Sequence, residues 1–196
     1  MTDILLDPLP TVWEGRAIDP DFRPMVWLSN QLRRQTSNDD PLHLANGALR
    51  RFYRDPVPPL EAPDAFAALE RFYLAGYPPA ALGKGSGTEA SCEAIYDYAF
   101  DAPFIVAAFQ QVYHIDLTAE NLHWFRFVAL FLALPEDTKM HRIMEIRQKD
   151  TSQMKDPERQ RWEEWKELYA LPGELKGGNR VATLEEREAA FIDSFS

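Results

Sequence analysis

Apolar residues recur every three or four positions along most of the chain, which is the spacing that places side chains on one face of an α-helix. Short polar residues and prolines mark several of the expected helix starts, because a side-chain oxygen there can accept an otherwise unpaired N–H group. These starts are Asp19 or Asp21, Asp40-Pro41, Asp101, Thr118 and Asp156-Pro157. The pattern predicts helices over about residues 22–36, 41–53, 66–75, 103–114, 118–134, 138–148 and 157–169.

Residues 11–18 instead predict a small β-hairpin around Glu14-Gly15, since glycine permits the positive φ that tight turns need. The helix expected at 118–134 is apolar nearly all round, which predicts a central position among its neighbours. The expected fold is therefore all-α, a single-domain bundle of about six to seven helices over residues 1–171 with a small N-terminal β-hairpin.

Two stretches interrupt the helical pattern. Residues 77–91 combine prolines with three glycines in five residues, and we expect them to form a mobile loop. Residues 172–196 are expected to form a flexible tail. Within this tail Thr183 and Glu186 have capping-box spacing, which predicts a short helix at 184–195 or a disordered end.

Composition and charge argue against several classes of protein. The chain has 31 acidic and 21 basic residues and a net charge of −10, which disfavours binding to nucleic acid. The longest apolar stretch, Trp124 to Leu134, carries Arg126 and is shorter than the roughly 20 residues of a membrane span. The single cysteine, Cys92, cannot form an intrachain disulfide. We therefore expect a cytoplasmic protein with no membrane partner.

Candidate chemistry is sparse. The four histidines, at positions 43, 114, 123 and 141, match no metal-binding spacing, and His123 near the head of the central helix is expected to cap or to pack. The glycine-rich GKGSG at 83–87 lacks both the ending of a phosphate-binding P-loop and a preceding strand, so a flexible linker is the better interpretation. No catalytic, cofactor-binding or metal-binding residue is predicted, and we expect that the protein is not an enzyme.

Charge and tryptophan positions suggest interaction surfaces. Residues 55–101 carry a net charge of −6 and residues 139–161 a net charge of +3, and such opposite patches favour self-association into a homo-oligomer. The ordinary alternatives are solvated charges and tryptophans that fill the core. The candidate interaction residues are Trp13, Trp27, Glu89, Glu93, Asp97, Arg142, Arg147, Trp162 and Trp165.

Four segments of the chain together follow the pattern of one known family. They are LLDPLPTVWEGRAIDPDFRPMVWL, DPVPPLEAPDAFAALERFYLAG, IYDYAFDAPFIVAAFQQVYHIDLTAENLHWFRFVALFLALPEDT and IMEIRQKDTSQMKDPERQRWEEWKELYAL. With them the chain resembles the phage gp-fifteen family, small proteins encoded in the tail modules of long-tailed bacteriophages. The resemblance runs over about residues 3–171. Its most specific part is HWFRF…LFLALPEDT, and the residues that match the family pattern are Asp101, His123, Trp124, Phe127 and Pro135. It departs from the family at the GKGSGTEAS insertion and after Pro172.

The resemblance implies a phage tail morphogenesis protein. Because the family is encoded beside the tape-measure gene, it further implies a tail assembly chaperone in the host cytoplasm. Such a protein binds the tape-measure protein, the tail tube protein or both, and is absent from the mature virion. The alternative is a structural virion component, such as a tail-completion or connector subunit. A metal-dependent enzyme that uses the histidines is the weakest alternative, since no set of residues with mutual geometry supports it.

Overall fold

The computed structural model describes residues 6–36, 40–75 and 94–173. Within them the chain divides into two compact units. The first unit contains residues 6–75, apart from the gap at 37–39, together with 121–129, and the second contains 94–120 and 130–173. The single domain expected over 1–171 stays a prediction. The loop predicted at 77–91 and the helix predicted at 184–195 lie outside the described residues.

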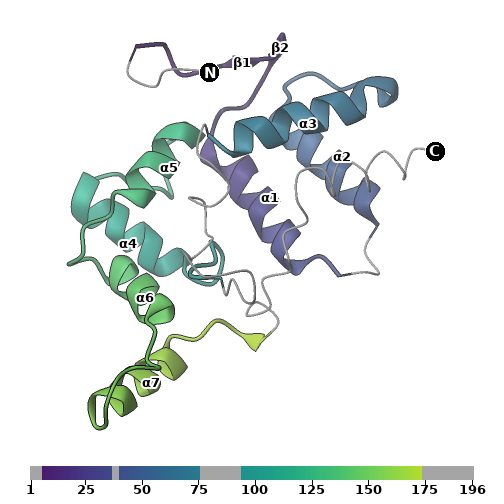
Figure 1. The fold of residues 1–196 in the computed structure, drawn as a ribbon. Helices are drawn as coiled ribbons and strands as arrows, with labels where there is room; N and C mark the ends of the chain where they lie inside the picture. The colour runs from purple at the N-terminus through teal and green to yellow at the C-terminus, as the bar shows by residue number, and fades with distance from the viewer. Residues whose placement is uncertain (1–5, 37–39, 76–93, 174–196) are drawn as a thin grey trace. The chain divides into compact units, whose positions relative to one another are not determined.

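The fold is all-α with a small N-terminal β-hairpin, as predicted (Figure 1). The described residues form seven α-helices, one 3-10 turn and two short strands. Their bounds are β1 Val12–Trp13, β2 Arg16–Ala17, α1 Phe22–Arg34, α2 Pro41–Phe52, η1 Pro59–Glu61, α3 Ala62–Tyr73, α4 Ala102–Tyr113, α5 Trp124–Leu132, α6 Lys139–Gln148 and α7 Glu158–Leu168. No helix among these residues is long and apolar enough to span a membrane.

The hairpin forms where glycine predicted it. β1 and β2 pair antiparallel, and the turn residues Glu14 and Gly15 have φ values of 48° and 84°. Positive φ at both central turn residues matches the right-handed twist of the flanking strands. Trp13 on β1 then lies against the aromatic core of the first unit, with its ring 5.4 Å from Phe72 and 6.1 Å from Phe125.

The core of the first unit is aromatic and is centred on Phe72. α2 packs against both α1 and α3. The Phe72 ring lies 4.9 Å from Phe52 and 4.8 Å from Phe125, so α2, α3 and α5 meet at this side chain. Trp124 is buried, and its indole N–H donates to the Tyr73 carbonyl at 2.8 Å, which satisfies its polar group. These contacts place the first part of α5 in the core of the first unit.

The second unit is built around α6, which packs against both α4 and α7. Phe109 of α4 and Ile143 of α6 are fully buried. Tyr96 and Tyr98 contact Phe131 at ring distances of 4.9 and 5.7 Å, so the segment before α4 closes over the end of α5.

Two of the predicted capping residues cap their helices. Asp21 and Asp40 accept backbone N–H groups at 3.0 and 2.9 Å, as expected of N-caps. At Asp101, the N-cap of α4, and at Pro157, the N-cap of α7, no side-chain hydrogen bond caps the helix.

The start predicted at Thr118 is wrong, because α5 begins at Trp124. Asp116 accepts both the backbone N–H of Thr118, at 2.8 Å, and its hydroxyl, at 2.6 Å, so Thr118 belongs to a separate turn.

Candidate functional site

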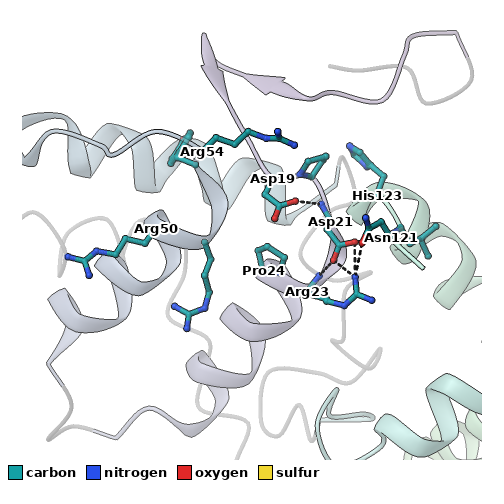
Figure 2. A pocket seen from close by; sticks show the side chains of 12 residues that line it. Asp19, Asp21, Arg23, Pro24, Arg50, Arg54, Asn121 and His123 are labelled. Atoms are coloured by element: carbon teal, nitrogen blue, oxygen red, sulfur yellow. Dashed lines mark hydrogen bonds and ion pairs between the residues drawn. The ribbon is translucent and has the colours of Figure 1, made fainter. Parts of the chain in front are cut away.

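An open pocket of about 800 Å³ lies in the first unit (Figure 2). Three segments line it: the approach to α1 and its first turn, the end of α2, and the residues just before α5. The lining residues are Asp19, Pro20, Asp21, Arg23, Pro24, Arg50, Arg51, Tyr53, Arg54, Asn121, Leu122 and His123. The lining includes four arginines and two aspartates, so the side chains of the pocket are positively charged in sum, although the chain as a whole is acidic.

Both pocket carboxylates are engaged in holding the backbone. Asp21 accepts the N–H of Arg23 at 3.0 Å and the N–H of Leu122 at 3.0 Å, which ties the start of α1 to the residues before α5. It also forms an ion pair with the Arg23 guanidinium at 2.9 Å. Asp19 accepts the N–H of Asp21 at 3.2 Å. These two carboxylates therefore act as caps, and the described residues hold no group of three or more potential metal ligands.

His123 has both ring nitrogens occupied. Nδ1 accepts the N–H of Phe125 at 3.1 Å, and Nε2 lies 3.0 Å from the carbonyl oxygen of Pro10. Because the first nitrogen accepts, the hydrogen-bond pattern assigns the proton to Nε2. Burial lowers the pKa of His123, which favours the neutral ring. The histidine caps α5, as expected, and its nitrogens are not open to a substrate or a metal.

The remaining polar groups of the pocket do not converge on one point. The hydroxyl of Tyr53 donates to the Ala65 carbonyl at 2.9 Å, and burial raises the pKa of Tyr53 to about 12. Arg54 donates through Nε to the Ile18 carbonyl at 3.0 Å. In Figure 2 the side chains of Arg50 and Arg54 extend in different directions. The pocket thus lacks the convergent donors that fix a small anionic ligand.

The charged residues expected on an interaction surface separate into buried and exposed ones. Asp97 is fully buried, and its carboxylate accepts the N–H groups of Ala99 and Phe100 at 2.9 and 2.8 Å. The prediction that Asp97 belongs to a docking surface is therefore wrong. Its side chain caps a turn instead, because a buried carboxylate needs such donors. Glu89 and Glu93, the other acidic candidates, lie outside the described residues.

Arg147 also turns inward, which corrects its predicted place on an interaction surface. Its guanidinium forms a two-bond ion pair with Asp101, at 2.6 and 2.9 Å, and the two side chains are 7% and 0% exposed. It further donates to the carbonyls of Ile95, at 3.0 Å, and Tyr169, at 2.7 Å. Arg142 of the same helix is exposed, as expected. One base from the positive stretch thus pairs with one acid from the negative stretch inside a single chain.

Two of the candidate tryptophans pack into the first unit. The indole N–H of Trp13 donates to the Ala68 carbonyl at 2.9 Å. The Arg51 guanidinium lies over the Trp27 ring, 3.9 Å from its centroid. The same ring lies so close to Gly47 that a Cβ atom at position 47 would be 2.7 Å from it. Both side chains are half-buried, so their contacts favour the alternative that they serve packing.

The other two tryptophans lie on α7, which has no buried residue. Trp162 is half-buried, with the Lys149 ammonium 5.1 Å from its ring. Trp165 stands edge-on to Trp162 at 5.3 Å and is 41% exposed, and Leu168 is 71% exposed. The alternative that the tryptophans fill the core does not hold for Trp165, whereas Trp162 is half-buried. α7 is therefore the strongest candidate contact surface of the second unit.

Comparison with known proteins identifies one family. Residues 79–171 match the family described as Bacteriophage Gp15 protein. No curated protein and no solved structure matches the chain. The matched segment contains α4 to α7, and with them the Asp101–Arg147 ion pair and the exposed side chains of α7.

Proposed function

Because residues 79–171 match the bacteriophage Gp15 family, we propose that the chain is a tail assembly chaperone. In this proposal it binds the tape-measure protein, the tail tube protein or both during assembly in the host cytoplasm, and leaves before the virion is complete. The family match carries the proposal. By itself it suggests the broader class, a phage structural or morphogenesis protein.

Exposed apolar side chains support a role in binding. Large hydrophobic residues remain in solvent on both units, and they are Leu6, Val12, Leu60, Phe100, Leu132, Trp165 and Leu168. Scattered apolar groups of this kind give weak and reversible contacts, and many copies along one long substrate can add up to a stable coat through avidity. A chaperone that must later be displaced needs this combination of weak single contacts and strong repeated binding.

Co-expression with the tape-measure protein tests the proposal. We expect the tape-measure protein to move into the soluble fraction and to co-purify with this chain. The control is co-expression with an unrelated acidic helical protein, which should leave the tape-measure protein insoluble. The tail tube protein, tested in parallel, separates the two partners. If neither protein is solubilised or co-purified, the chaperone proposal is contradicted.

The alternative is a structural virion component, such as a tail-completion or connector subunit, because the family match supports that class equally. Quantitative mass spectrometry of purified virions separates the two functions. A chaperone is absent from the particles, whereas a structural subunit is present in a fixed ratio to other tail proteins. Recovery of such a ratio would replace the chaperone proposal with the structural one.

A further inference from the structure

We propose that one face of α7 is a self-association surface, on which α7 of a second copy of this chain packs in the antiparallel direction. The face consists of Arg161, Glu164, Trp165 and Leu168, and we call it the α7 strip. This inference is independent of the proposed function, because it concerns contacts between copies of the chain and not the binding of another phage protein.

The four residues of the α7 strip share one side of the helix. They are spaced at i, i+3, i+4 and i+7, which aligns side chains along two turns of an α-helix. Trp165 and Leu168 are 41% and 71% exposed, although both are large and apolar. An apolar pair at this spacing is the usual anchor of a helix that packs against another helix.

Charges on α7 differ between its sides. Away from the α7 strip, Arg159 lies 3.6 Å from Glu163 of the same helix and 3.5 Å from Asp156, which precedes the helix. On the α7 strip, Arg161 and Glu164 are both exposed, and neither forms an ion pair within the described part of the chain. The apolar pair is therefore accompanied by one base and one acid that are available to a partner.

The order of these charges makes the α7 strip complementary to itself. On the α7 strip the base, Arg161, precedes the acid, Glu164, by about one turn. A second α7 in the antiparallel direction places the basic end of each helix beside the acidic end of the other, and two-fold symmetry forms each contact twice. A parallel pair would set like charges side by side. The charge pattern therefore selects a second copy in the antiparallel orientation.

The association is expected to be weak. Two large apolar side chains per copy cover far less than the ~800 Å² per partner of a standard interface. Exposed ion pairs add little and are screened by salt. Copies should therefore pair at high concentration and low salt and separate on dilution, which suits a surface used when many copies are brought close together.

Sedimentation equilibrium over a concentration series at low salt measures the self-association. We expect Leu168→Glu to weaken it by at least tenfold, which corresponds to about 1.4 kcal/mol. The matched control is Leu60→Glu, a change at a leucine of the first unit that is 96% exposed, and we expect it to leave the association unchanged. Circular dichroism checks that both variants keep their helices. A wild-type chain that stays monomeric at every concentration, or equal effects of the two variants, would overturn the proposal.

Charge-reversal variants test whether the partner of the α7 strip is a second copy of α7. Arg161→Glu gives an α7 strip with two acids, and Glu164→Arg gives one with two bases. Each variant alone should associate more weakly than the wild type, whereas an equimolar mixture should form mixed pairs at least as well as the wild type. A mixture no better than its separate components would contradict antiparallel pairing of two copies and would leave a foreign helix as the partner of the α7 strip.

Discussion

The buried ion pair between Arg147 and Asp101 gives the sharpest test of how the second unit is held together. Arg147→Met keeps the aliphatic length of the side chain but removes every donor. Asp101 then stays fully buried, with the N–H of Asp97 at 2.9 Å as its remaining donor among the hydrogen bonds described here. The carbonyls of Ile95 and Tyr169 each lose a partner as well.

The expected cost follows from burial. Because the two side chains are 7% and 0% exposed, solvent screening does not reduce the loss as it does at a surface pair. Removing one partner of a buried pair lowers the free energy of unfolding by about 3–5 kcal/mol. For a chain of this size each kcal/mol corresponds to roughly 2–4 °C, so we expect the melting temperature to fall by about 6–20 °C.

Thermal and urea unfolding followed by circular dichroism measure this loss. The matched control is Arg142→Met on the same helix, an exposed arginine whose replacement should change the free energy of unfolding by no more than about 0.5 kcal/mol. Combining Arg147→Met with Asp101→Asn should cost less than the sum of the two single changes, because the double variant buries no unpaired charge. The reasoning is refuted if Arg147→Met and Arg142→Met lose the same amount.

Two further predictions concern the first unit. Burial lowers the pKa of His123 below its ordinary 6.5, so the unfolded chain binds more protons at this residue than the folded chain does. The free energy of unfolding should therefore fall as the pH drops through about 6.5. Urea unfolding at about pH 7.5 and about pH 5.5 measures this change, which should be absent in His123→Gln. Gly47→Ala should destabilise by about 1–3 kcal/mol, because the new Cβ would lie 2.7 Å from the Trp27 ring and this clash outweighs the gain in helix propensity. Asn46→Ala, an exposed neighbour on α2, is its control in thermal unfolding, and equal stability of the two variants would contradict the packing argument.

Local signals in the sequence predicted most helices and the hairpin. Asp21 and Asp40 cap their helices because a cap needs only a residue and the backbone next to it. Thr118 failed as a cap because Asp116, two residues away, captures both its N–H and its hydroxyl. A short polar residue can close a turn as well as begin a helix, and the spacing alone does not say which occurs.

The roles of the candidate interaction residues depend on contacts between residues that are distant in the sequence, and the sequence does not show these contacts. Asp101 and Arg147 are 46 positions apart, so their charges looked like parts of two separate surfaces until the fold paired them. On α7 the same helical spacing includes Trp162, which is half-buried, and Trp165 and Leu168, which are exposed. A single packing neighbour covers one side of a helix, and the sequence does not say how wide that side is.

The link from Asp21 to the N–H of Leu122 has a consequence for synthesis of the protein. The first unit takes most of its residues from the first 75 positions, yet its aromatic core also requires Trp124, Phe125 and Phe127, which follow residues 94–120 of the second unit. A nascent chain cannot complete this core until α5 has left the ribosome. Residues 94–120 of the second unit have then been synthesised as well, so the core of the first unit is completed only after part of the second unit has been made.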